Sequence, residues 1–245
     1  MRAILPAEDF IYLADSGHVP YGTKSQEYIR TRSLILTQFL LEHGVKAIVI
    51  ACNTATAAAA SHIRSSVNVP VVAMEPAVKP AAAATRSGVI GVLATTGTLE
   101  NSRFAGLLER YGQEVKVVSQ SAPGLVEQVE AGDLSGPRTR ALIEEYTVPL
   151  LRAGADTVVL GCTHYPFLRP LIADVVGQGI TLIDTGAAVA RQLRRVLDES
   201  GLLNRNDTVG TEAFWTSADA EQGRIVASRL WGSPVSMRRL PDGVA

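Results

Sequence analysis

The sequence has few cysteines, no long apolar segment and no surplus of charge of either sign. Only two of its 245 residues are cysteine, which excludes a disulfide framework and favours reduced thiols. No apolar run approaches the roughly 18 residues that a membrane span requires, and the first residues, MRAILPAEDF, lack the apolar core of a signal peptide. The formal net charge is −1 without a basic block, so neither nucleic acid nor a membrane surface is an expected partner. We therefore expect a soluble, cytoplasmic protein.

Short β-branched apolar runs alternate with stretches rich in alanine and leucine at helical spacing. Strands are expected at 10–15, 47–52, 69–74, 88–94, 115–120, 157–162, 180–184 and 212–217. Helices are expected near 24–43, 54–65, 76–85, 99–111, 123–131, 136–153, 166–176, 186–199 and 219–230. This alternation predicts an α/β fold with mostly parallel sheets. The strands are apolar on both faces, as buried parallel strands are.

The strand–helix pattern repeats. Met74 lies 22 residues after Cys52, and Asp184 lies 22 residues after Cys162, each pair spanning a strand, a cysteine, a helix and a strand. We interpret this as two related halves, although coincidence in a repetitive α/β pattern is the alternative. The last segment adds one more strand and helix that can complete the first sheet. The predicted domains are therefore residues 1–76 plus 188–245, and residues 77–187.

Each cysteine ends an apolar run, in VIACNTATAAAA (49–60) and in VVLGCTHYPFL (158–168). Ligands of parallel α/β sheets bind at the carboxyl ends of strands, next to the N-termini of the following helices. A helix N-terminus lowers the pKa of a thiol and favours the thiolate. The capping residue types Asn53, Thr54 and Thr163, together with the free N–H groups of the first turn, can hold a carboxylate.

Two thiols that flank a cleft suit racemisation, because one thiolate removes an α-proton and the opposite thiol returns a proton to the other face. No lysine stands in a context that suggests a Schiff base with pyridoxal phosphate, so we expect no cofactor. A buried cysteine can also be a small apolar core residue. A zinc site of Cys52, Cys162 and His164 is disfavoured because the Cys-Thr-His spacing is too tight for the common zinc patterns, and no metal is expected.

The chain resembles the glutamate racemase family of the cofactor-independent aspartate/glutamate racemase superfamily. CNTA is shared widely in the superfamily, whereas PYG and GCTHYP together indicate the glutamate branch. The resemblance implies two pseudo-symmetric α/β domains with the active site in the cleft between them, production of D-glutamate for peptidoglycan, and a homodimer. The matching segments are DSGHVPYG (15–22), ACNTATAAA (51–59), MEPAVKPA (74–81), GVLATTGT (91–98), PGLVEQVEAG (123–132), GCTHYPFL (161–168) and LIDTG (182–186).

Carried over position by position, the resemblance makes Cys52 and Cys162 the two acid/base groups. It implies that Asp15, Glu130 and His164 assist or position the thiols. Taken alone, Asp15 is also compatible with a turn cap and Glu130 with a solvated helix end. The residues that the resemblance assigns to the substrate's carboxylates and ammonium are Ser16, Pro20, Tyr21, Gly22, Asn53, Thr54, Thr95, Thr98 and Thr163.

The sequence departs from the family pattern at its start. Family members open with a strand and a glycine-rich loop that carries an Asp-Ser pair beside the first cysteine, whereas this sequence matches only from LPAEDFIYLADSG (5–17) onward. We therefore expect a less stable first domain and weak or absent racemase activity in the 245-residue form. The alternatives are a binding or regulatory homologue without catalysis, and a racemase of aspartate, a hydantoin or a substituted malonate.

Overall fold

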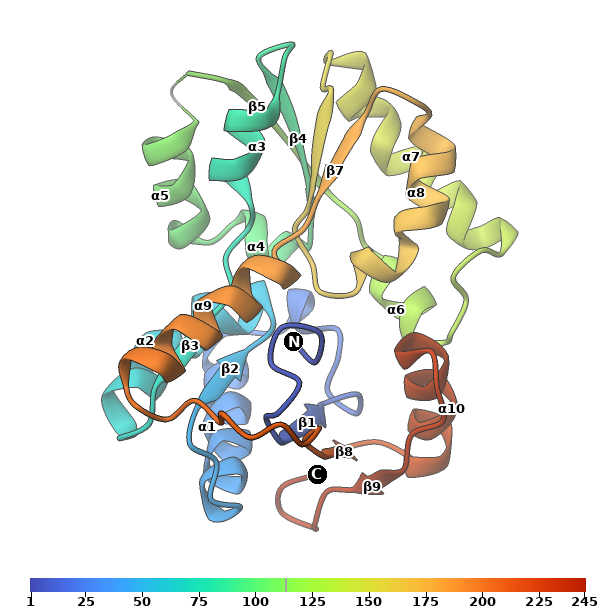
Figure 1. Ribbon diagram of the computed structural model, residues 1–245. Helices are drawn as coiled ribbons and strands as arrows, with labels where there is room; N and C mark the ends of the chain where they lie inside the picture. Colours follow the sequence, from blue (N-terminus) through green and yellow to red (C-terminus); the bar gives the residue numbers. More distant parts are fainter. Residues whose placement is uncertain (113) are drawn as a thin grey trace. The chain divides into compact units, whose positions relative to one another are not determined.

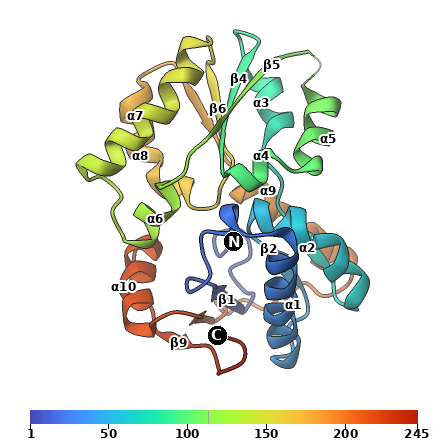
Figure 2. The same cartoon turned by 180° about the vertical axis from the view of Figure 1, so that it is seen from behind.

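A computed structural model describes residues 1–112 and 114–245. These residues form two compact units (Figures 1 and 2). Unit 1 comprises Met1–Ile50, Ala58–Met74 and Gly186–Ala245, and unit 2 comprises Ala51–Ala57 and Glu75–Thr185. All strand pairs in the described residues are parallel, which confirms the predicted α/β class. The domain boundaries expected from the sequence stay a prediction.

Unit 2 is built on a four-stranded sheet in the order β5-β4-β6-β7. Its strands are β4 (Val89–Ala94), β5 (Lys116–Ser121), β6 (Thr157–Leu160) and β7 (Thr181–Ile183). The chain passes from β4 to β5 on one side and then crosses to β6 on the other side of β4. The strand order therefore reverses at β4, and ligands of such sheets bind at the carboxyl ends of the strands beside the reversal.

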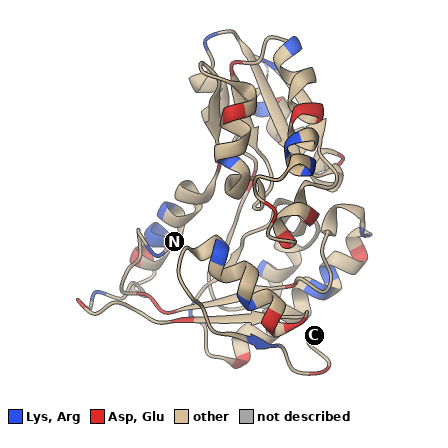
Figure 3. Cartoon of the chain, turned by 90° about the vertical axis from the view of Figure 1, so that its right-hand side faces the viewer, with Lys and Arg blue, Asp and Glu red and all other residues tan. Residues whose placement is uncertain are grey.

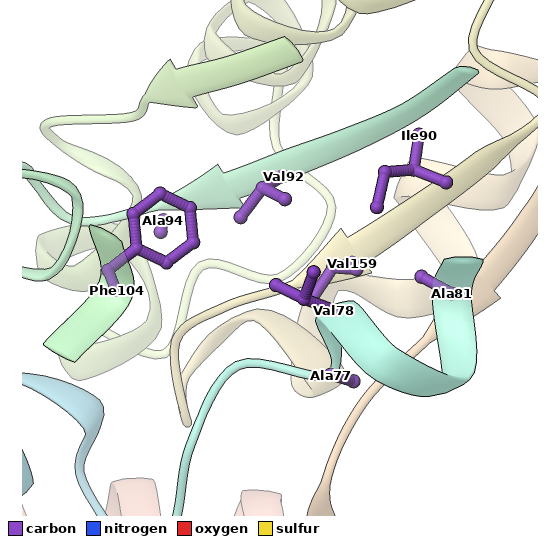
Figure 4. Close-up of a cluster of buried hydrophobic side chains, with 8 residues drawn as sticks. All are labelled: Ala77, Val78, Ala81, Ile90, Val92, Ala94, Phe104 and Val159. Carbon is purple, nitrogen blue, oxygen red and sulfur yellow. The ribbon is translucent and has the colours of Figure 1, made fainter. Parts of the chain in front are cut away.

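Helices cover both faces of this sheet because the side chains of β4 alternate (Figure 1). Ile90 and Val92 point toward α3 (Val78–Ala84) and α5 (Ser102–Tyr111), where they pack with a buried cluster (Figure 4). Gly91 points the opposite way, toward α7 (Pro137–Arg152), which packs beside α8 (Arg169–Val176). A Cβ at Gly91 would lie 2.9 Å from Leu150, so glycine there lets α7 approach the sheet.

Three further helical segments complete unit 2. They are α4 (Thr96–Leu99), α6 (Leu125–Glu130) and the 3₁₀ helix η2 (Tyr165–Leu168).

Unit 1 contains two parallel sheets. The first has the order β1-β8-β9, and the second pairs β2 with β3. The strands are β1 (Phe10–Ala14), β2 (Ile48–Ile50), β3 (Val71–Ala73), β8 (Glu212–Thr216) and β9 (Met237–Arg239). The helical elements are η1 (Tyr21–Thr23), α1 (Gln26–Glu42), α2 (Asn53–Ser66), α9 (Gly186–Glu199) and α10 (Ala220–Trp231), of which the first turn of α2 belongs to unit 2.

A buried cluster joins β3 to α9 in unit 1. Val72 and Met74 pack there against Val189 and Leu193, together with Leu5 from the start of the chain. Lys and Arg residues are interspersed with Asp and Glu along both units (Figure 3). No helix in the part of the chain that the structure describes is both long and apolar enough to cross a membrane.

All eight predicted strands are confirmed to within two residues at either end. The sequence missed β9, whose three residues Met-Arg-Arg carry no apolar run. The helix expected over 99–111 begins only at Ser102, because the Asn101 side chain caps it by accepting a hydrogen bond from the Arg103 N–H at 2.8 Å. The helix expected over 166–176 opens with the 3₁₀ turn η2.

The cluster around Ile90 should contribute strongly to the stability of unit 2. Ile90 is fully buried, so Ile90→Ala is expected to lower the free energy of unfolding by about 2–5 kcal/mol. Val209 is 75% exposed, and Val209→Ala should change the same quantity by less than about 0.5 kcal/mol. Urea unfolding followed by circular dichroism measures both. Equal effects of the two substitutions would contradict the packing described.

Candidate active site

Cys52 is the residue that caps helix α2. Its carbonyl oxygen accepts the Thr56 N–H at 2.8 Å, and its sulfur accepts the Ala55 N–H at 3.4 Å. Asn53 and Thr54, expected as caps, instead lie inside the first helical turn. Their side chains are therefore available for contacts outside the helix.

The thiol of Cys52 has a strongly raised pKa. Burial is the largest cause and the negative charge of Cys162 adds to it, so the pKa rises to about 11. Hydrogen bonds from Ala55 and Thr54 act in the opposite direction but are outweighed. The expectation of a lowered pKa at this helix N-terminus is therefore wrong for Cys52, which keeps its proton at neutral pH.

Cys162 follows strand β6 after a single glycine. The Gly161 N–H donates to the Leu93 carbonyl at 2.7 Å. The backbone that follows β6 therefore lies directly beside the end of β4. A Cβ at Gly161 would lie 2.9 Å from the Ala94 Cβ, which makes glycine necessary there. Cys162 itself is buried, and both cysteines are free thiols.

His164 connects Cys162 to a carboxylate. Its Nδ1 lies 3.7 Å from the Cys162 sulfur, and its Nε2 lies 2.7 Å from Glu130 Oε1 at the end of α6. Burial lowers the pKa of His164, but the hydrogen bonds with Cys162 and Glu130 outweigh it and raise the pKa to about 10. The imidazole is therefore protonated at neutral pH, and it presents a positive charge to the Cys162 sulfur.

Asn53 joins the two cysteine-bearing turns. Its Nδ2 donates to the Gly161 carbonyl oxygen at 2.7 Å in a buried hydrogen bond. Its Oδ1 is also buried and accepts no hydrogen bond from any residue that the structure describes. A buried acceptor of this kind is costly unless a donor reaches it, so Oδ1 is a candidate contact for a ligand donor.

Three predicted substrate residues, Thr54, Thr95 and Thr98, meet through their hydroxyl groups. Thr95 follows the end of β4, so this contact lies at the edge of the sheet where the strand order reverses. Thr163 lies between Cys162 and His164 and is partly exposed. Unit 2 thus contains all the predicted site residues from Cys52 to Thr54 and from Thr95 to His164.

The other predicted site residues belong to unit 1. Asp15, directly after β1, accepts hydrogen bonds from the Tyr21 hydroxyl and from Arg32 of helix α1. Burial raises the pKa of Asp15, but these hydrogen bonds outweigh it, and the net effect lowers the pKa. Ser16 lies in the turn after Asp15. Pro20 and Gly22 flank Tyr21 at the start of η1, and the Val19–Pro20 peptide bond is cis.

Arg32 is a partner of Asp15 that was not expected from the sequence. The ion pair is almost fully buried, and Arg32 also donates to the Val244 carbonyl at 2.8 Å. The sequence does contain a sign of this ion pair. Arg32 comes three residues after the apolar Ile29 and therefore lies on the buried face of the helix. A charged residue on such a face requires a partner of opposite charge.

Known proteins resemble this chain along almost its whole length. Residues 1–193 match the family model described as Asp/Glu/Hydantoin racemase. A glutamate racemase from Pseudomonas aeruginosa is 57% identical over 241 residues, covering 98% of this chain and 91% of the relative. The structure of a glutamate racemase from Bacillus anthracis aligns with a TM-score of 0.88 at 29% identity, covering 100% of this chain and 92% of that one.

A third protein adds a bound ligand. The Escherichia coli glutamate racemase, solved in complex with L-glutamate and an activator, aligns with a TM-score of 0.86 at 31% identity and covers 98% of this chain and 91% of that one. With the family model and these relatives, the chain belongs to the Asp/Glu/Hydantoin racemase family.

The contact between Glu130 and His164 predicts a pH-dependent stability. The pKa of His164 is raised from an ordinary value near 6.5 to about 10, so its protonation stabilises the fold fully below about 6.5, and this contribution is lost as the pH rises through 10. Glu130→Gln should lower the pKa of His164 by at least about one unit and the unfolding free energy by about 1 kcal/mol below pH 6.5.

NMR titration of the His164 ring and urea unfolding across this pH range measure these effects. Glu127→Gln, an exposed change on the same helix α6, is the matched control and should leave the His164 titration unaltered. An unaltered titration in Glu130→Gln as well would refute the assigned contact.

Proposed function

We propose that this protein interconverts L-glutamate and D-glutamate without a cofactor, using Cys52 and Cys162 as the two acid/base groups. The observation that carries the proposal is the pair of unlike thiols in unit 2. Cys52 keeps its proton, whereas the sulfur of Cys162 lies beside a protonated histidine. The high identity to the Pseudomonas aeruginosa glutamate racemase and the L-glutamate bound to the Escherichia coli enzyme support the choice of substrate.

The reaction needs one thiolate and one thiol at the start. The Cys162 thiolate takes the α-hydrogen as a proton, and the electron pair left on Cα delocalises into the adjacent carboxylate. The Cys52 thiol then gives its proton to Cα from the other face, which inverts the centre. The reverse reaction uses the same groups in exchanged roles, so the direction depends on which sulfur holds the proton.

The charge that develops on the carboxylate requires hydrogen-bond donors. We assign this task to the first-turn N–H groups of α2 and to the hydroxyls of Thr54, Thr95, Thr98 and Thr163. The unpaired Oδ1 of Asn53 suits the substrate's ammonium, since it is a buried acceptor without a donor. The unit 1 residues proposed to contact the substrate are Ser16, Pro20, Tyr21 and Gly22.

Three residues are proposed to support the thiols. His164 stabilises the Cys162 thiolate, and Glu130 holds His164 in its protonated form. Asp15 acts in unit 1, where its contact with Tyr21 orders the Pro-Tyr-Gly turn. We also propose that the chain divides into two domains. The first comprises residues 1–76 and 188–245, and the second comprises residues 77–187.

The proposed product, D-glutamate, connects the protein to cell-wall synthesis. D-glutamate made by this family is consumed in peptidoglycan synthesis, on which cell shape depends, and we propose the same role here. The reaction requires both thiols to stay reduced, which the cytoplasm ensures, so we propose a cytoplasmic protein. A homodimer is the proposed assembly.

The test measures the incorporation of deuterium at the α-carbon of glutamate. Incubating L-glutamate or D-glutamate with the protein in deuterated water should give inversion together with α-deuterium in the product, measured by NMR and chiral chromatography. Cys52→Ser and Cys162→Ser should each lower racemisation by at least about 100-fold, because each removes one proton-transfer group. Added pyridoxal phosphate should change neither rate nor absorbance.

The controls separate the alternatives. Exchange with aspartate but not glutamate would contradict the proposed substrate, and glutamate binding without exchange would indicate a homologue that lacks catalysis. His62→Asn, an exposed substitution on α2, should retain the full rate. Activity that depends on pyridoxal phosphate would overturn the cofactor-free mechanism.

A further inference from the structure

Three threonine hydroxyls form a closed triangle in unit 2. The oxygen–oxygen distances are 3.0 Å for Thr54–Thr95, 3.2 Å for Thr54–Thr98 and 2.9 Å for Thr95–Thr98. Thr54 and Thr98 are buried, with 6% and 3% of their surface exposed. These hydroxyls therefore satisfy one another rather than solvent.

One corner of the triangle touches a catalytic thiol. The Ala55 N–H donates to the Cys52 sulfur at 3.4 Å, and the adjacent Thr54 lowers the pKa of the same thiol through its side chain and its backbone N–H. Thr95 and Thr98 both contact the Thr54 hydroxyl. These hydroxyl-to-hydroxyl hydrogen bonds connect the two residues to the neighbourhood of Cys52.

The number of hydroxyl hydrogens limits how the three threonines can respond to the charge on Cys52. Each hydroxyl carries a single hydrogen. When Cys52 is a thiolate, a Thr54 hydroxyl that donates to the sulfur can only accept from the other two threonines. The two shorter contacts, 2.9 Å for Thr95–Thr98 and 3.0 Å for Thr54–Thr95, then form a chain from Thr98 to Thr95 to Thr54 to sulfur, in which each bond polarises the next. When Cys52 is a thiol, Thr54 need not donate to the sulfur, and the hydroxyls are free to donate to the substrate's carboxylate.

We propose that Thr95 and Thr98 are positioning residues for proton transfer at Cys52, holding the Thr54 hydroxyl as a donor to the thiolate. The proposal rests on the proposed role of Cys52 as an acid/base group and adds to it a task distinct from substrate contact. It also gives the two sulfurs different support. Cys162 has a charged histidine–glutamate pair, whereas Cys52 has a chain of neutral hydroxyls.

The test measures Cys52 alone, without substrate. In a Cys162→Ser background, Cys52 is the only thiol, and its rate of alkylation by iodoacetamide at a fixed pH below its pKa follows its thiolate fraction. Thr95→Val keeps the shape but removes the hydroxyl, and it should slow alkylation roughly 3- to 10-fold. Thr95→Ser restores the hydroxyl and should restore the rate, and Thr98→Val should slow alkylation less than Thr95→Val.

Two controls make the result specific. Thr96→Val alters an exposed neighbour on the same helix α4, whose hydroxyl bonds to Ser121 at 2.6 Å, and it should leave Cys52 unaffected. In a Cys52→Ser background, Thr95→Val should leave the alkylation of Cys162 unchanged. In the protein with both cysteines, Thr95→Val should lower kcat and move its pH profile with little change in KM.

Three results would overturn the proposal. They are unchanged Cys52 alkylation in Thr95→Val, equal slowing of both cysteines, and a rise in KM alone, which would assign these threonines to substrate binding only. Because alkylation requires no turnover, it reports on the hydroxyl chain even if glutamate exchange fails. Failure of the proposed function and failure of this inference are thus distinguishable.

Discussion

The buried hydrogen bond from Asn53 to the Gly161 carbonyl is the contact on which the site in unit 2 depends. Cys52 directly precedes Asn53, and Cys162 directly follows Gly161, so this bond of 2.7 Å fixes the two cysteine-bearing turns together. It forms because α2 starts at Asn53 and because residue 161 has no side chain to hold the turn away from β4. Breaking it would leave a buried carbonyl unpaired, at a cost of about 1–3 kcal/mol.

Closeness of the two sulfurs makes their protonation states interdependent. The negative charge of Cys162 contributes to the raised pKa of Cys52, so a state with two thiolates is disfavoured. Protonated His164 lies beside the Cys162 sulfur, and Glu130 holds that proton in place. The proposed two-base racemisation requires a starting pair with one proton between the two sulfurs, and burial keeps that proton on Cys52.

The sequence predicted those features that repeat along the chain. Apolar runs gave the eight strands, and a cysteine at the end of two such runs gave the position of the site. Contacts between side chains that are distant in the sequence have no corresponding pattern in the sequence. The pairing of Arg32 with Asp15 and the meeting of Thr54 with Thr95 depend on how elements pack, which periodicity does not specify. The direction of the Cys52 pKa was wrong for the same reason, since a helix N-terminus is a local property and burial is not.

Burial keeps the proton on the Cys52 thiol at neutral pH, and because the chain has only two cysteines the Cys52 thiol can be followed directly. Isotope-labelled cysteine would give two Cβ signals in NMR spectra, which the Cys52→Ser and Cys162→Ser variants would assign. We expect the Cys52 signal to remain that of a thiol until the pH approaches about 11. A Cys52 signal that titrates near an ordinary thiol pKa of about 8.5 would contradict this expectation.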